Sequence, residues 1–210
     1  MTEDLYGYPT RCKKCHGITE CSLNVRPFYK LGGDTRLMLI GQDPTIFKKQ
    51  DRVKCVLMLD DPNSQLSRWL KGMFGEHNFD KLTMYATNIV KCTFSQPPSV
   101  SPQGGLKFLQ PHFENCKEYL LTEIQQYKPT LVMTLGEPAH KLFRSMFKDP
   151  DKIDKAMKKA FTGKFIPVEL ESTKFSYSPC LHIKTFRVAE TYGQGVTKFK
   201  EGLIEFFLRG

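Results

Sequence analysis

The stretch "LMLIGQDP", residues 37–44, decides the fold. Four apolar residues run directly into Gly41, Gln42 and Asp43. An uninterrupted apolar run of this kind is typical of a strand that is covered on both faces, as in a parallel sheet. Gly41 permits a tight turn with a close backbone approach, and Pro44 stiffens the bond that follows. The pattern therefore predicts a buried strand that ends by holding the Asp43 carboxylate at its tip, facing a cleft.

Three further apolar runs predict strands of the same kind: "MYATNIV" (84–90), "TLVMTLG" (130–136) and "KFSYSPC" (174–180). The segments between and after them have the apolar spacing of amphipathic helices, at residues 63–74, 111–127, 137–147 and 197–208. The second of these begins with Pro111, which suits the first turn of a helix. Strands that alternate with helices indicate a three-layer α/β/α sandwich with a central four-stranded parallel sheet, in one domain of residues 1–210.

Two segments lack this regular pattern. Residues 93–110 are rich in Pro, Ser and Gly and predict a loop, whereas residues 148–164 are rich in Lys and predict a short helix or a solvated face. Ligand sites in α/β sheets gather beyond the carboxyl ends of the strands. The candidate site is therefore expected where three strands end, at residues 41–45, 88–92 and 178–182.

The composition suits a protein that meets a polyanion. The 210 residues carry a net charge of +9 and the pI is about 9.2, so the electrostatic field favours nucleic acid or anionic lipid, although scattered solubilising charge is the alternative. No apolar run approaches the roughly 20 residues that a membrane span needs, and the start "MTEDLYGYPT" lacks the pattern of a signal peptide. We expect an intracellular, cytoplasmic protein without a membrane partner.

The cysteines indicate metal or cluster ligation rather than disulfides, because seven of them form an odd set in a chain without a secretion signal. Cys12 and Cys15 form a C-x-x-C pair. Cys92 lies in the loop after the second predicted strand, and Cys116 lies in the helix that is predicted next. Four thiolates from two distant segments can hold a tetrahedral zinc ion or a cubane iron-sulfur cluster. Buried free cysteines are the alternative.

Two polar side chains at strand ends are candidates for chemistry. Asp43 either caps nearby amides in a turn or provides a catalytic carboxylate. Asn88 lies in an otherwise apolar run, where an unsatisfied amide is costly, so it either ties down a loop or reads the edge of a nucleobase. From the residues alone both alternatives stand.

Several segments in fixed order resemble the uracil-DNA glycosylase superfamily, most closely its iron-sulfur (family 4-like) branch of bacteria and archaea. The resemblance spans nearly the whole chain. Its most specific parts are "TNIVKC" and the run from Cys116 through "KPTLVMTLGEPA". The segments that carry it are "CKKC", "LMLIGQDP", "TNIVKC", "ENCKEYLLTEIQQYKPTLVMTLGEPA" and "YSPCLHIKT".

The resemblance implies a [4Fe-4S] cluster held by Cys12, Cys15, Cys92 and Cys116, as a structural clasp near the DNA-binding face; structural zinc is the alternative. Cys21 competes with Cys15 for the second ligand position, because "CSLNVRP" also looks like the stretch that follows the first ligands in that branch.

The resemblance also implies roles for pocket residues. Gln42 and Asp43 look like the main uracil-excising branch, in which the Asp orients water, whereas the iron-sulfur branch usually has Glu and a small residue there. Thr45 takes the place of an aromatic residue that excludes the thymine methyl group, and because Thr45 is smaller, a weaker filter against 5-substituted pyrimidines is expected. Gly41 belongs to the same turn, and the base-stacking residue is either Phe47 or Leu59.

The last motif departs from the family. Ser178 stands where many relatives have a His that donates a hydrogen bond to the departing base. His182 is at the position of the residue that wedges into the DNA stack, so it either fills the gap left by the flipped base or replaces the missing donor. Lys184 and Arg187 are the expected phosphate contacts near this wedge.

Together these features imply a monomeric, prokaryotic-like hydrolase that cleaves N-glycosidic bonds: it flips uracil out of single- or double-stranded DNA and excises it in base excision repair. Asp43 would orient water and stabilise the oxocarbenium ion, and Asn88 would pair with the base. The alternatives are a non-catalytic module that binds uracil or DNA, and a glycosylase for another lesion such as hypoxanthine.

Overall fold

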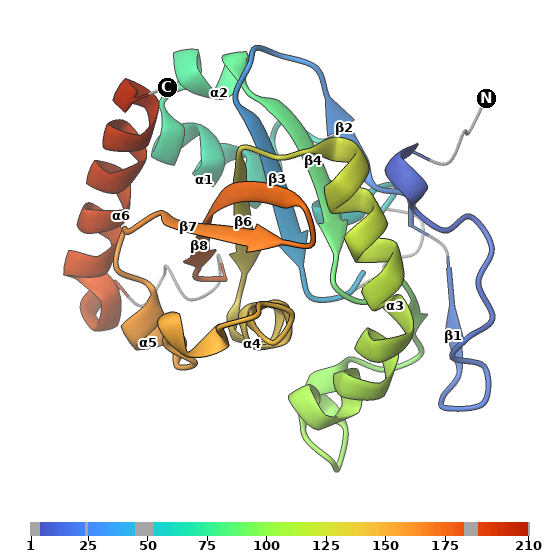
Figure 1. Cartoon of the computed structure of the whole chain (residues 1–210). Helices are drawn as coiled ribbons and strands as arrows, with labels where there is room; N and C mark the ends of the chain where they lie inside the picture. Colours follow the sequence, from blue (N-terminus) through green and yellow to red (C-terminus); the bar gives the residue numbers. More distant parts are fainter. Residues whose placement is uncertain (1–4, 24, 45–52, 183–188, 210) are drawn as a thin grey trace.

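A computed structural model describes residues 5–23, 25–44, 53–182 and 189–209 (Figure 1). Its centre is a six-stranded mixed sheet with the order β2-β4-β3-β6-β8-β7. The strands are β2 (Phe28–Lys30), β3 (Arg36–Gly41), β4 (Thr83–Asn88), β6 (Leu131–Leu135), β7 (Ile166–Leu170) and β8 (Thr173–Cys180).

The four strands predicted from apolar runs are β3, β4, β6 and β8, and they pair in parallel as adjacent strands. The prediction of a four-stranded parallel sheet is nevertheless incomplete, because β2 and β7 add an antiparallel strand at each edge. An edge strand has a neighbour on one side only and need not be apolar on both faces. The three-residue β2 and the segment "IPVEL" of β7, which contains a proline and a glutamate, therefore carry no continuous apolar signal.

Helices cover both faces of the sheet. Along β3, Leu37 and Leu39 pack on one face, whereas Met38 and Ile40 pack on the other, so every residue of the run is buried. The first face carries α1 (Gln65–Phe74), α2 (Glu76–Lys81) and α6 (Ala189–Arg209), and the second carries α3 (Gly105–Tyr127) and α4 (Glu137–Arg144). The three-layer arrangement agrees with the prediction.

The start of α3 differs from the prediction. The helix begins at Gly105, six residues before Pro111, so that Pro111 lies inside it and part of the predicted loop 93–110 is helical. Leu109 is fully buried, and its packing favours an extra turn and a half at the start of the helix. Pro111 is exposed and lies beyond the first turn of α3, so the helix lacks the one hydrogen bond that an N–H there would donate to the carbonyl oxygen of Lys107. The first residues of the predicted loop form another short strand, β5 (Thr93–Phe94).

Smaller elements complete the described chain. Strand β1 (Cys21–Ser22) pairs with β5, and the Lys-rich segment contains a short helix, α5 (Met157–Ala160). Four 3-10 turns occur: η1 (Leu5–Gly7), η2 (Val56–Met58), η3 (Pro98–Val100) and η4 (Pro150–Lys152). No helix in the described ranges has the length and apolarity to cross a membrane.

The topology places a crevice between β3 and β6. From β3 the chain crosses to β4 on one side, with α1 and α2 on one face of the sheet. From β6 it crosses towards β8 on the other side, and α4, the first helix of this connection, lies on the opposite face. In sheets of this kind the neighbouring loops diverge where the direction of winding reverses, and ligands bind there. Gly41 and Leu135, at the ends of these two strands, are thus expected to border the site.

Helix α6 packs against a glycine turn so closely that Gly202 has no room for a side chain. A Cβ atom there would lie 1.9 Å from the carbonyl oxygen of Gly163. We expect Gly202→Ala to lower the free energy of unfolding by roughly 1–3 kcal/mol, because the backbone must shift. The matched control is Gly72→Ala in α1, where a Cβ meets nothing within 4 Å and the greater helix propensity of Ala should stabilise the protein by about 1 kcal/mol. Urea unfolding of both variants tests this pair, and an undiminished stability of Gly202→Ala would contradict the packing.

Candidate active site

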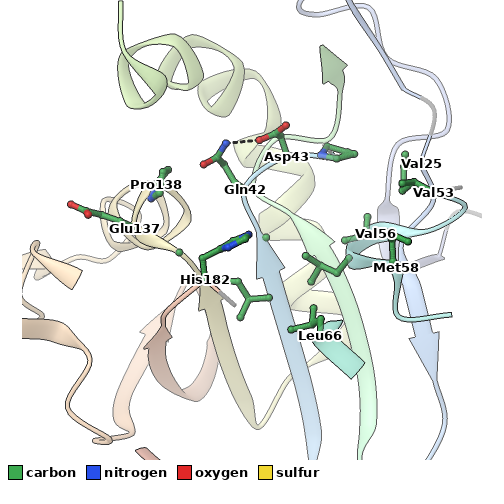
Figure 2. A pocket seen from close by; sticks show the side chains of 15 residues that line it. Val25, Gln42, Asp43, Val53, Val56, Met58, Leu66, Glu137, Pro138 and His182 are labelled. Atoms are coloured by element: carbon green, nitrogen blue, oxygen red, sulfur yellow. Dashed lines mark hydrogen bonds between the residues drawn. The ribbon is translucent and has the colours of Figure 1, made fainter. Parts of the chain in front are cut away.

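A cavity of about 550 Å³ opens at the carboxyl ends of β3 and β6 (Figure 2). Its walls come from the turn after β3, from η2, from the start of α4 and from the segment after β8. The residues that line it are Val25, Gly41, Gln42, Asp43, Pro44, Val53, Val56, Leu57, Met58, Leu66, Leu135, Gly136, Glu137, Pro138 and His182. The volume lies in the range of about 300–1,000 Å³ that is usual for small-molecule sites.

The turn after β3 brings a carboxylate to this cavity. Asp43 is only 8 % exposed, and the Gln42 side-chain amide donates a hydrogen bond to its Oδ1 at 2.5 Å. Two main-chain bonds hold the turn, because the N–H groups of Ile89 and Val90 donate to the carbonyl oxygens of Gly41 and Gln42 at 2.8 and 3.0 Å. The segment after β4 thus supports the turn that presents Asp43.

Asn88 lies behind this turn, at the end of β4. Its side chain is fully buried, and neither its amide nitrogen nor its oxygen has a hydrogen-bond partner among the described residues. Asn88 does not line the cavity directly, but a Cβ atom on Gly41 would lie 2.3 Å from its Oδ1. Only a glycine therefore leaves space between the carboxamide and the cavity. A buried amide without partners is uncommon and costly, which makes Asn88 a candidate for contact with a ligand.

Ser178 and His182 belong to one segment, but Ser178 lies in the sheet and His182 lies at the cavity. Ser178 is buried within β8, opposite Met133 of β6, and does not line the cavity. His182 follows β8, is exposed and lines the cavity. Its Cβ would lie 3.5 Å from a Cβ atom added at Gly136. Figure 2 shows His182 between Glu137 of α4 and the η2 side of the site. Between the two predicted donors, only His182 has access to the cavity.

The apolar wall differs from the prediction. Leu59 packs in the core and does not line the cavity, whereas Leu57 and Met58 do. Both have left-handed backbone conformations, with φ of 61° and 53°, which is uncommon for non-glycine residues and costs about 1–3 kcal/mol each. A backbone reversal of this kind changes which side chain of "VLML" faces the site, and the residue types carry no signal for it.

Some predicted residues lie outside the described ranges, and others come from an unexpected place. Thr45, Phe47, Lys184 and Arg187 are not among the described residues. The start of α4 contributes cavity residues that the sequence analysis did not select, namely Glu137 and Pro138. Their position directly after the β6 run in "LGEPA" was the available signal. The Glu137 carboxylate forms an ion pair with Lys141 one turn along the helix.

Five cysteines gather near α3 and the β1–β5 pair. Burial raises the pKa of the Cys15 and Cys92 thiols, and the thiol of Cys21 lies close enough to both to raise it further. Cys15 also accepts a hydrogen bond from the Asn115 amide at 3.4 Å, and Cys116 accepts one from the main-chain N–H of Lys91 at 3.5 Å. Cys12 lies close enough to influence the pKa of Cys15 and of Cys116.

These thiols are of the right chemical type for soft metals. Burial raises the pKa of Cys116 to about 11 and raises that of Cys92 further, so ligation would have to displace protons. Within the ranges that the structure describes, no group of three or more His, Cys, Asp or Glu has a geometry that could hold a metal ion. The predicted cluster is therefore not supported by this geometry. Cys21, like Cys15, lies near other thiols of the group, so both stay candidates for the second ligand position.

A second unpartnered polar side chain lies on α3. His112 is fully buried between Phe94 and Phe108, and neither ring nitrogen has a hydrogen-bond partner in the described structure. Burial lowers the pKa of His112 below its usual value of about 6.5. As the pH falls below about 6.5, the unfolded chain takes up a proton at this position while the native protein does not, so stability decreases.

We therefore expect His112→Phe to reduce the loss of stability on acidification. Between pH 7 and pH 5 the parent should lose up to about 1.4 kcal/mol per pH unit more than the variant, measured by urea unfolding at each pH. The other buried histidine, His140, is hydrogen-bonded to Tyr177 and Asp154 and is present in both proteins, so its contribution to the pH dependence cancels in the comparison. Parallel pH profiles for parent and variant would show that His112 does not contribute.

Comparison with known proteins gives one family. The model of the uracil DNA glycosylase superfamily matches residues 28–190, more than three quarters of the chain. No curated protein sequence matches. The matched range includes the turn with Asp43, the end of β4 with Asn88, the start of α4 and His182, and so covers most of the cavity.

Proposed function

We propose that this chain, which belongs to the uracil DNA glycosylase superfamily, is a monomeric DNA glycosylase that hydrolyses the N-glycosidic bond of uracil in DNA. The observation that carries the proposal is that two polar groups lie at the same cavity. A nearly buried carboxylate, Asp43, lines it, and behind Gly41 at its edge lies the carboxamide of Asn88, which has no hydrogen-bond partner among the described residues.

The reaction requires stabilisation of opposite charges. The C1′–N1 bond breaks with its electron pair on the departing base, positive charge develops on the deoxyribose, and a water oxygen forms the new bond to C1′. Asp43 would face the sugar, stabilise its positive charge and orient the water. The hydrogen bond from the Gln42 side-chain amide holds Oδ1 of this carboxylate.

Recognition of the base would use fixed polar groups and an apolar wall. The main-chain N–H groups of Gln42 and Asp43 would face a uracil oxygen, and the Asn88 carboxamide would pair with the Watson-Crick edge. Leu57 and Met58 replace Leu59 as candidates for the wall on which the base rests, because they line the cavity. Phe47 stays as a prediction for base stacking. Thr45 is smaller than the aromatic residue that excludes the thymine methyl group in the main uracil-excising branch, so it would give a weaker filter against 5-substituted pyrimidines.

A base in a duplex must be flipped out before it enters such a cavity, at a cost of a few kcal/mol of unstacking. His182, at the mouth of the site, is proposed to fill the gap in the stack or to donate a hydrogen bond to the departing base. Ser178 is the weaker candidate for that donor because it is buried in β8. Lys184 and Arg187 would contact phosphates, and the net charge of +9 favours the DNA backbone.

The cluster is a separate proposal that rests on the resemblance and on the nearness of the thiols. Cys92 and Cys116, with Cys12 and either Cys15 or Cys21, would hold a [4Fe-4S] cluster or a zinc ion. The group would act as a structural clasp and supply no step of the reaction. Metal analysis and visible absorption of protein purified without air test it: iron with sulfide supports the cluster, zinc supports the alternative, and the absence of both refutes ligation.

The proposed activity is tested with oligonucleotides that carry a single uracil, in single and double strands, followed by alkaline cleavage of the abasic product. We expect release of uracil and no cleavage of the same sequences with thymine. Binding without release would instead indicate a non-catalytic module. Release of hypoxanthine but not of uracil would indicate a glycosylase for another lesion.

A further inference from the structure

We propose that the buried ion pair between Lys91 and Glu123 positions Asn88 for recognition of the base. The inference rests on the role of Asn88 in the proposed function and adds two positioning residues that do not touch the substrate. Lys91 follows the end of β4, and Glu123 lies on α3.

Stability alone is a poor reason for this pair. The Lys91 side chain is 1 % exposed and that of Glu123 is fully buried. Both charges are removed from water, and the attraction between them seldom exceeds the cost of that desolvation by much; apolar residues of the same size often serve stability equally well. A buried pair of this kind is therefore a candidate for fixing one conformation.

The pair forms a network that satisfies every donor. The Lys91 ammonium donates to Glu123 Oε2 at 2.5 Å, to Thr87 Oγ1 at 2.6 Å and to the main-chain carbonyl oxygen of Asn88 at 2.7 Å. The other oxygen of Glu123 accepts hydrogen bonds from the hydroxyls of Tyr85 and Thr87 at 2.7 and 2.9 Å. With its three protons directed at three fixed acceptors, the ammonium group has one orientation.

The third of these bonds connects the network to the candidate active site. It holds the carbonyl group of Asn88, and the next two N–H groups of the chain hold the main chain of Gly41 and Gln42. The Asn88 carboxamide itself has no partner among the described residues, so its direction depends on its own backbone and on contact with Gly41. Rotation of the peptide after Asn88 would turn the carboxamide and loosen the turn that presents Asp43.

The test compares a double variant with single variants. Lys91→Met leaves the Glu123 carboxylate buried and unpaired and should destabilise the protein strongly. Lys91→Met with Glu123→Gln removes both charges and keeps an acceptor for the hydroxyls of Tyr85 and Thr87, so part of the stability should return. We expect the double variant to fold with a kcat for uracil release about 10²-fold below that of the parent, and with little change in KM for the DNA. If the double variant regains parental kcat together with stability, the pair has only a structural role.

Arg144→Met is the matched control, because Arg144 also holds a main-chain carbonyl oxygen, that of Ile153 at 2.5 Å, in a different part of the fold. It should lose stability and keep its kcat. An equal fall of kcat in this variant and in the double variant would contradict the proposal.

A second readout separates this inference from the proposed function. In ¹⁵N NMR spectra the side-chain amide resonances of Asn88 should shift in the double variant and stay in place in Arg144→Met. If the parent releases no uracil, the proposed function fails, and these resonances alone decide the positioning role. Unchanged Asn88 resonances in the double variant overturn it.

Discussion

Replacing Asp43 by Asn is expected to lower the rate of uracil release by about 10²- to 10⁴-fold while the protein stays folded. The amide has nearly the same shape as the carboxylate and can still accept the hydrogen bond from Gln42. It carries no negative charge, however, so it neither stabilises the positive sugar nor orients water with the same strength. The loss should therefore appear in kcat rather than in KM for the DNA.

The measurement is single-turnover release of uracil from a single-stranded oligonucleotide, with unfolding by urea as a check on stability. Asp80→Asn provides the matched control: Asp80 is an exposed carboxylate on α2 that does not line the cavity, so its replacement should leave the rate unchanged. Full activity of Asp43→Asn would end the mechanism proposed above.

Gly41→Ala is expected to reduce kcat by about 10²-fold, through the position of Asn88 rather than through Asp43. The new methyl group would lie 2.3 Å from Asn88 Oδ1 and 2.9 Å from Leu57 Cδ2. The leucine side chain can rotate away, but the carboxamide is fully buried and has to turn or retreat. Base release from oligonucleotides measures the effect, and binding of the same DNA without turnover shows whether phosphate contacts are intact.

Two further variants distinguish the effect of the clash between the new methyl group and Asn88 from the effect of losing the Asn88 carboxamide. Gly41→Ala with Asn88→Ala removes the clash, so its stability should recover while its activity stays low. Gly72→Ala adds the same methyl group where nothing lies within 4 Å and should be fully active. If Gly41→Ala is as active as Gly72→Ala, the contact between Gly41 and Asn88 has no part in the reaction.

Patterns along the chain predicted the centre of the fold and missed its edges. The run at β3 alternates between two apolar clusters, with Leu39 in one and Met38 in the other, and such burial on both faces leaves a continuous apolar signal. The edge strands β2 and β7 have no such requirement. The early start of α3 depends on burial of Leu109 against the sheet layer, which outweighs the local preference of Pro111 for a first turn.

The residues of the candidate site that could be predicted are those that lie at or just after the ends of predicted strands. Gly41, Gln42 and Asp43 end a recognisable strand, and His182 follows another, so these four could be selected before the fold was known. Leu57 and Met58 could not, since left-handed backbone at two successive non-glycine residues is imposed by surrounding contacts rather than by their types.

The amino-acid sequence by itself determined the α/β class, the four central strands, the family and the carboxylate at the end of β3, because each is written in residues that are close together in the chain. Only the tertiary structure decided that Leu57 rather than Leu59 faces the cavity, that Ser178 is buried in the sheet, and that Lys91 meets Glu123 beneath Asn88. The reason is physical: direction and contact between segments far apart in the chain depend on packing and on the pairing of buried charges, which no local pattern of residue types specifies.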